Sequence, residues 1–274
     1  MVDSQSETIP NSDPDLITVL QEINRISDIE HSAGVVLRDA IDQVLLGDRT
    51  GRYSIAQLSR QEKAHIGTQV EIWLRRDLLG NSEGDLLDAK IAGIEVDIKN
   101  TIGSNWMIPH EAVDQLCLLS AIDEANRRYS LGLIRTVGNI LGKPNQDGKR
   151  SLTQEGRSNI QWIVRDGNLP VSVFLMIDGD LRNRVLGQKS GQRRVLELFR
   201  NVLKTPILWS DLAIAARQRD VRARARDARR TLAKEGLTVL CGSWLKDRTV
   251  AASLGVLLHS DYWISIPSSE IPSS

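Results

Sequence analysis

The chain has 274 residues, of which 35 are basic and 35 acidic, so its overall charge does not point to any class of partner. Its length suits one large domain or two ordinary ones, and no run approaches the roughly 18 apolar residues that a membrane-spanning helix requires. The two cysteines, Cys117 and Cys241, lie far apart inside apolar runs, which indicates buried thiols in a cytoplasmic protein and argues against a disulfide or a metal cluster.

The first part of the chain is predicted to be helical. Residues 1–14 are polar, acidic and proline-containing, so we expect a disordered lead-in that is not a signal peptide. Apolar residues at helical spacing predict a helix over 15–46. A polar turn follows, and then a helix that begins at a capping box formed by Ser59 and Glu62 and ends at Gly80.

Strands and helices alternate over the next hundred residues. Apolar alternation predicts strands over 85–89 and 93–100, and a proline suited to a first helical turn opens a helix expected over 109–127. The remaining elements are a strand over 129–137, a loop over 141–151, a helix over 151–164 and a strand over 170–178. These elements predict an α/β domain over 15–180, with a mixed sheet flanked by helices.

A second, smaller domain is predicted at the C-terminus. Residues 181–192 have the composition of a linker, and the domain would occupy residues 193–274. Helices are expected over 193–203 and 221–236, and between them residues 205–220 are expected to form a turn and a second helix. Two short strands around a turn are expected over 237–255. Three helices followed by a small hairpin are typical of a winged helix-turn-helix domain.

The zero net charge conceals an uneven distribution. Residues 181–236 hold 15 Lys and Arg against 5 Asp and Glu, whereas residues 1–180 hold 18 against 27. A solvated basic surface would interleave its cations with acids, so this block is better explained as an electrostatic footprint for a polyanion. We therefore expect double-stranded DNA as a partner.

The third helix of this block has the features of a DNA-binding helix. Its apolar stripe, which can pack on the other two helices, consists of Val221, Ala225, Ala228 and Leu232. Its basic face consists of Arg222, Arg226, Arg229 and Arg230. A basic helix of this kind can enter a major groove, where Arg donates hydrogen bonds to guanine.

The strand over 93–100 carries Glu95, Asp97 and Lys99 at alternate positions, so these three side chains share one face. An ordinary solvated strand face could carry them too. In a protein that binds DNA, however, carboxylates can hold Mg²⁺, and a lysine beside them can orient or deprotonate the attacking water. An acid before a strand that carries (Asp or Glu)-x-Lys is the signature of restriction-type nucleases, present here without its usual proline.

Asp88, Asp97 and Lys99 supply this signature, although Asp85 competes with Asp88 and Glu95 with Asp97. We prefer Asp88 and Asp97 because Lys99 then lies one strand period from its carboxylate. Glu71 lies in the middle of the preceding helix among apolar neighbours. A buried carboxylate without a partner is costly, so we expect Glu71 to meet a metal ion or a base.

The chain also resembles the NaeI-type restriction endonucleases, through GDRTGRYSIAQLSRQEKAHIGTQVEIWLRR, DAKIAGIEVDIKNT and NWMIPHEAVDQLCLL. The resemblance extends over most of the chain and implies a restriction-endonuclease-like fold followed by a winged-helix domain. It implies an active site of Glu71, Asp88, Asp97 and Lys99, with the three acids as Mg²⁺ ligands. It further implies a homodimer that binds two copies of a DNA site, one at each kind of domain, and cuts only one.

The main interpretation is a site-specific type II DNA endonuclease that requires Mg²⁺. One alternative is a winged-helix DNA-binding regulator without nuclease activity, and another is a repair endonuclease that nicks DNA at a mismatch or modification. A degenerate active site would favour the regulator, whereas the set of residues found here is complete.

Overall fold

The structure, a computed structural model, describes residues 13–218, 220–260 and 262–272, so the predicted lead-in over 1–14 lies outside the described residues except for its last two. The chain divides into two compact units. The first unit comprises residues 1–41 and 60–170, and the second comprises residues 42–59 and 171–274. No helix within the described ranges is long and apolar enough to cross a membrane.

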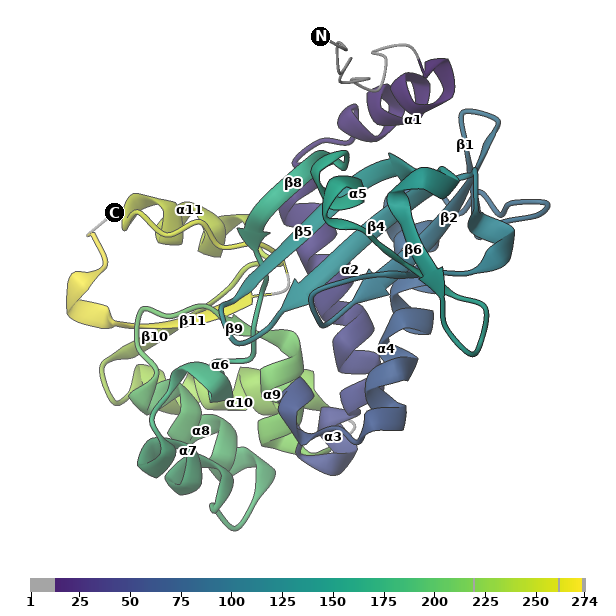
Figure 1. Cartoon of the computed structure of the whole chain (residues 1–274). Helices are drawn as coiled ribbons and strands as arrows, with labels where there is room; N and C mark the ends of the chain where they lie inside the picture. The colour runs from purple at the N-terminus through teal and green to yellow at the C-terminus, as the bar shows by residue number, and fades with distance from the viewer. Residues whose placement is uncertain (1–12, 219, 261, 273–274) are drawn as a thin grey trace, which may run out of the picture. The chain divides into compact units, whose positions relative to one another are not determined.

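A five-stranded mixed sheet forms the centre of the first unit (Figure 1). Its strands, in spatial order, are β1 (Ala89–Ile91), β2 (Ile94–Thr101), β4 (Leu116–Asp123), β5 (Arg128–Arg135) and β8 (Gln161–Asn168). β2 and β4 pair in parallel, and the other neighbours are antiparallel. In the register of β2 and β4, Asp97 lies opposite Cys117 and Lys99 lies opposite Leu119. The predicted mixed α/β fold is confirmed.

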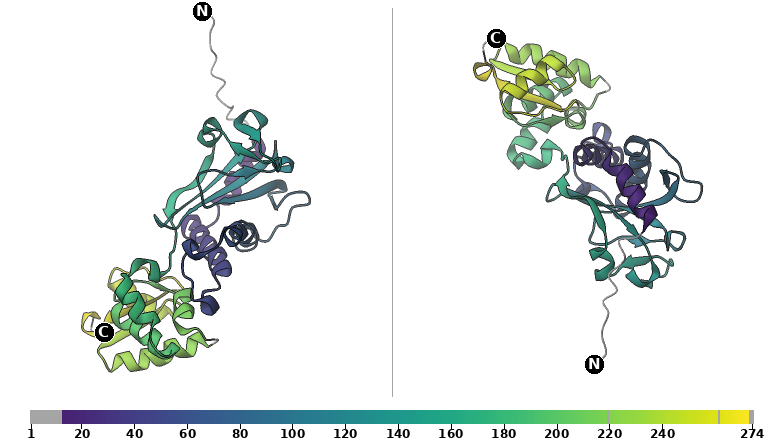
Figure 2. Two further views of the ribbon diagram at one scale, coloured as in Figure 1. Left: turned by 60° about the horizontal axis from the view of Figure 1, so that its bottom comes forward. Right: turned by 90° about the horizontal axis from the view of Figure 1, so that it is seen from above.

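The two faces of this sheet are covered differently. On one face lies a small sheet of β3 (Met107–Ile108), β7 (Arg150–Leu152) and β6 (Leu141–Pro144), with α5 (Gln154–Ser158). An apolar cluster that includes Cys117, Leu119, Leu141 and Leu152 joins this small sheet to β4. Figures 1 and 2 show α2 (Ile29–Leu45) on the opposite face, where Arg38 is buried and pairs with Glu124.

The helical N-terminal part was predicted in outline. The single helix expected over 15–46 is instead two helices, α1 (Pro14–Asn24) and α2, because the chain turns between them with Asp28 in a left-handed conformation. The Asp13 side chain caps α1 by accepting a hydrogen bond from the Leu16 N–H. α4 (Arg60–Trp73) follows, and continues into a π-helical turn over Leu74–Leu78.

Several expected elements of the first 180 residues are wrong. The strand expected over 85–89 begins only at Ala89, where β1 starts, and the loop expected over 141–151 contains the paired strands β6 and β7. The segment expected to be a helix over 109–127 instead forms a 3₁₀ turn (His110–Ala112) and then β4. The apolar residues of β4 are buried because β4 is a central strand between β2 and β5. In the helix expected over 151–164, only α5 is helical, capped by Thr153, and β8 follows. The strand expected over 170–178 is the short helix α6 (Val173–Met176), because Ser172 caps it.

In the second unit, helices pack on a three-stranded sheet. The helices are α3 (Gly47–Thr50), α6, α7 (Gly179–Leu186), α8 (Gly191–Asn201), α9 (Trp209–Ala216), α10 (Val221–Ala233) and α11 (Leu245–Ser253). The strands, in spatial order, are β10 (Leu237–Cys241), β11 (Tyr262–Pro267) and β9 (Ile207–Leu208). Short 3₁₀ turns occur at Ile55–Gln57, Gly138–Ile140 and Ser268–Glu270 of the chain. The predicted apolar stripe of α10 is confirmed: Val221, Ala225, Ala228 and Leu232 are buried in the core.

The boundaries of the second unit differ from the expected ones. The segment expected to be a linker, 181–192, lies mostly within α7 and the start of α8, because Asp178 and Ser190 cap these helices. Residues 42–59 also belong to this unit, and Tyr53 packs against its core. Between the two strands expected over 237–255 there is no simple turn: α11 follows β10, and the second strand, β11, begins only at Tyr262.

Candidate functional site

Three acidic side chains of the first unit surround the ammonium group of Lys99. Its Nζ lies 2.9 Å from Asp97 Oδ1, 3.1 Å from Asp88 Oδ2 and 3.6 Å from Glu71 Oε1. It also donates a hydrogen bond to the carbonyl oxygen of Ile98 at 2.8 Å. The structure therefore brings together the four residues that were predicted to form the active site.

Local structure explains how each side chain reaches the cluster. Asp97 and Lys99 are two residues apart in β2 and point to the same side of the sheet. Asp88 stands immediately before β1, and its Oδ2 accepts a hydrogen bond from the Ile98 N–H at 2.8 Å, which ties it to β2. Glu71 lies in the last turn of α4, which packs against β2.

The two aspartates of the cluster differ in acidity. Asp97 is only 4% exposed, and this burial raises the pKa of its carboxyl to about 7, although the Lys99 ammonium acts in the opposite direction. Burial also acts to raise the pKa of Asp88, but the Ile98 N–H and the Lys99 ammonium outweigh it and hold the pKa below its ordinary value. Asp88 is therefore the readily ionised partner of the pair.

The pKa values of Lys99 and Glu71 are shifted by the same surroundings. Burial alone would lower the pKa of Lys99, but the carboxylates around it outweigh burial and raise the pKa, so the side chain stays protonated at neutral pH. Burial raises the pKa of Glu71, and the charges of Lys99 and, more weakly, Lys149 oppose that rise. In this arrangement Lys99 is a hydrogen-bond donor and a positive charge, and is not available as a base.

Asp85 and Glu95, which the sequence left as alternatives, lie in the turn beside the cluster. The Glu95 carboxylate accepts hydrogen bonds from the N–H groups of Asp85, Leu86 and Leu87 at 2.9, 3.2 and 3.0 Å, and these bonds lower the pKa of Glu95 to about 2. The Asp85 side chain is 78% exposed and pairs with Lys90. Glu95 therefore stabilises the turn that leads into Asp88, a role that no sequence motif indicated, whereas the Asp85 side chain lies at the surface.

The donor atoms of the cluster suit a hard divalent cation. Within the described part of the chain, no three Asp, Glu, His or Cys side chains are grouped so that they could hold a metal ion among themselves. Mg²⁺, however, is usually bound through one or two carboxylates and completes its octahedron with waters and substrate phosphate. Asp88 and Asp97, which share the Lys99 ammonium, offer two such carboxylates, and Glu71 offers a third nearby. The residues present therefore fit Mg²⁺.

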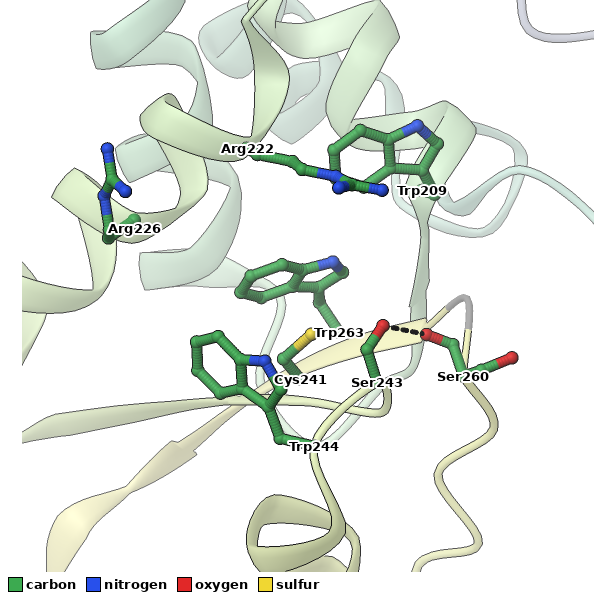
Figure 3. A pocket seen from close by; sticks show the side chains of 8 residues that line it. All are labelled: Trp209, Arg222, Arg226, Cys241, Ser243, Trp244, Ser260 and Trp263. Atoms are coloured by element: carbon green, nitrogen blue, oxygen red, sulfur yellow. Dashed lines mark hydrogen bonds between the residues drawn. The ribbon is translucent and has the colours of Figure 1, made fainter.

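The four arginines predicted on α10 of the second unit have different surroundings. Arg222 and Arg226 line a pocket of about 440 Å³ together with Trp209, Trp244 and Trp263 (Figure 3). The guanidinium carbon of Arg222 lies 5.7 Å from the centroid of the Trp209 ring. The three tryptophans come from separate segments of the chain, so charge and helical spacing in α10 did not predict them.

Arg229 and Arg230 are not equivalent to the first two. Arg229 donates two hydrogen bonds to the buried carboxylate of Asp247 in α11, at 2.9 and 3.2 Å, and lies over the ring of Trp244. This geometry gives Arg229 a role in holding α11 against α10. Arg230 is 75% exposed and lies 3.9 Å from Asp227, so it stays accessible to a ligand.

Comparison with known proteins identifies relatives along almost the whole chain. The family described as restriction endonuclease NaeI matches residues 19–265. The type II restriction enzyme NaeI of Lentzea aerocolonigenes is 38% identical over an alignment of 240 residues that covers 84% of this chain and 75% of that enzyme.

Proposed function

The chain belongs to the NaeI restriction endonuclease family, whose members are type II site-specific DNA endonucleases, and from this premise we propose that it hydrolyses DNA at the cluster of Glu71, Asp88, Asp97 and Lys99 with Mg²⁺ as cofactor. The observation that carries this proposal is the convergence of three carboxylates on one ammonium group. Such a combination of hard oxygen donors and one retained positive charge suits phosphodiester hydrolysis.

In this proposal Asp88 and Asp97 would hold Mg²⁺, and Glu71 would support them from α4. Mg²⁺ would supply a Lewis acid for the phosphate and lower the pKa of a bound water. Lys99, protonated and anchored by the carbonyl of Ile98, would orient the attacking water through a hydrogen bond and offset negative charge that develops on the phosphate. The burial of Asp97 strengthens these electrostatic effects, because little water screens them.

For the second unit we infer a winged-helix domain that binds DNA. The order α8, α9, α10, β10 and β11 supports this, with α11 inserted where a wing would be. α10 would enter the major groove and present Arg222 and Arg226 to base edges. Arg230 would contact phosphates, because it is exposed at the end of the same helix.

We further infer that the protein acts as a homodimer that binds two copies of its DNA site and cuts one. The homodimer and the cutting of one site are what membership of the family implies, and two features of the chain support the two DNA sites. The first unit carries the carboxylate cluster, whereas the second carries the arginines of α10, so each unit has its own set of side chains suited to DNA.

Plasmid cleavage tests the proposed chemistry. The full-length protein is incubated with plasmid DNA in Mg²⁺ or in EDTA, and we expect discrete linear fragments only with Mg²⁺. Asp97→Ala and Lys99→Ala should each reduce the cleavage rate by about 10²-fold or more, the size of one missing acid–base or electrostatic contribution. The matched control is Asp85→Asn, which neutralises an exposed carboxylate of the neighbouring turn and should cut at close to the wild-type rate. Equal cleavage by wild type, Asp97→Ala and Lys99→Ala would refute the assignment.

A further inference from the structure

A basic hairpin lies within the acidic first unit. It is formed by β6 and β7, and residues 141–152 contain Lys143, Lys149 and Arg150 against the single acid Asp147. Lys143 and Lys149 are both exposed. Within the described residues neither lysine forms an ion pair. Both cations are therefore accessible to an anionic ligand.

The turn of this hairpin has a well-defined shape. The Asn145 side-chain oxygen accepts hydrogen bonds from the N–H groups of Asp147 and Lys149 at 3.0 and 2.9 Å, and the Asn145 N–H donates to the Lys149 carbonyl at 2.8 Å. Gly148 adopts the left-handed conformation that closes the turn, with φ of 75°. Because the backbone of the turn is fixed in this way, binding a ligand there orders the lysine side chains and does not need to order the turn as well.

The hairpin is anchored on the face of the sheet that carries the catalytic cluster. Leu141 and Leu152 share an apolar cluster with Cys117, and the Cys117 thiol lies 3.8 Å from Asp97 Oδ2. Lys149 is close enough to Glu71 for its charge to act on that carboxylate. In Figure 1 the turn between β6 and β7 extends beyond the edge of the five-stranded sheet.

Electrostatics explains why such cations are needed there. Residues 1–180 carry nine more acidic than basic side chains, and the site adds a local group of carboxylates that repels a DNA backbone. Several other cations around the site are already paired with acids: Arg75 with Glu83, Arg76 with Asp77, and Lys90 with Asp85. Lys149, whose charge acts on Glu71, and Lys143 on the same hairpin are available to attract phosphate.

We propose that the β6–β7 hairpin binds the phosphate backbone of substrate DNA beside the scissile bond through Lys143 and Lys149, an inference that rests on the proposed nuclease function. Lysine suits this task because its ammonium is a point charge that needs no fixed geometry to pair with phosphate. The contacts would place the strand over the carboxylates and would be independent of base sequence.

The test compares full-length wild type with Lys143→Ala/Lys149→Ala. The plasmid concentration that gives half the maximal cleavage rate is measured at several salt concentrations. Removing one lysine–phosphate pair lowers the slope of log affinity against log salt by about 0.9, so we expect a decrease of about 2 and a half-saturating concentration raised on the order of tenfold. The maximal rate and the Mg²⁺ requirement should stay close to wild type, which a general structural defect would not allow.

Two further variants separate charge from structure. Lys143→Arg/Lys149→Arg keeps both charges and should retain the wild-type slope. Arg165→Ala removes one exposed cation from β8, the edge strand opposite β1, and should leave the slope unchanged. An unchanged slope and half-saturating concentration in the double alanine variant would overturn the proposal. If wild type itself fails to cut in Mg²⁺, the nuclease function fails, and the hairpin is then judged by the same slope comparison for DNA binding in EDTA.

Discussion

Replacing Asp97 with Asn should abolish cleavage and yet stabilise the folded protein in the absence of metal. Folded Asp97 keeps its proton up to about pH 7, whereas the unfolded carboxyl loses it near its ordinary pKa of 3.8. Between these two values the folded state binds more protons than the unfolded state, so the free energy of unfolding of the wild type falls as pH rises. Asn has a similar shape and does not titrate, and it avoids the cost of a buried charge.

The size of this effect follows from the pKa of Asp97. A rise from 3.8 to about 7, at about 1.4 kcal/mol per pKa unit, corresponds to about 4 kcal/mol when Asp97 is fully ionised. The variant also loses the ion pair between Asp97 and Lys99, and Asp88 still holds the ammonium at 3.1 Å. We therefore expect the free energy of unfolding to increase on the order of 1–4 kcal/mol above about pH 7, and the gain to vanish in strong acid.

Urea unfolding of the metal-free protein at about pH 5 and about pH 8 measures this gain. Asp88→Asn is the matched control. Burial acts to raise the pKa of Asp88, but the Ile98 N–H and the Lys99 ammonium outweigh burial and lower the pKa in the folded state. Its ionised form therefore stabilises the fold above its ordinary pKa, and the Asn variant should lose stability at both pH values. If Asp97→Asn is no more stable than wild type at about pH 8, or if its gain does not grow with pH, the reasoning is refuted.

Three other predictions follow from the same structure. Glu71→Gln should raise the Mg²⁺ concentration needed for half-maximal cleavage, because an amide is a poorer ligand for a hard cation; an unchanged metal titration would remove Glu71 from the site. At limiting Mg²⁺ the cleavage rate should rise as pH passes through about 7, since protonation of Asp97 competes with metal binding, and saturating Mg²⁺ should flatten this dependence. Arg222→Ala/Arg226→Ala should weaken binding of the full-length protein to DNA by on the order of 1–3 kcal/mol for each base contact that is lost. Titration of DNA in EDTA measures this affinity, and an affinity equal to wild type would show that α10 does not contact DNA bases.

Local patterns in the sequence predicted the structure correctly where the spacing of residues within one helix or strand is enough to define it. The alternation of Ile94, Val96 and Ile98 with charged residues predicted β2, because side chains of a strand alternate between its faces. The same alternation placed Asp97 beside Lys99, as the 2.9 Å distance between Lys99 Nζ and Asp97 Oδ1 confirms. The apolar stripe of α10 was predicted in the same way from helical spacing.

Local patterns failed where burial on both faces removes the alternation. Residues 116–122 of β4 are almost continuously apolar and pass equally for a buried helix, which is why a helix was expected over 109–127. Only pairing with β2 and β5 makes this segment a central strand. The side chains of Thr153 and Ser172 cap α5 and α6 and so determine where these short helices begin. Residue propensities favoured a longer helix and a strand in these two places.

The sequence alone determined which chemical groups were available and, through the family resemblance, what class of reaction they serve. Tertiary structure decided which of these groups meet. The Ile98 N–H donates a hydrogen bond to Asp88 and so holds it at the cluster, whereas three backbone N–H groups of the neighbouring turn donate hydrogen bonds to Glu95. Asp247, far along the chain, engages Arg229 and leaves Arg222 and Arg226 at the pocket. Each choice depends on an interaction between residues distant in sequence, and periodicity carries no information about such interactions.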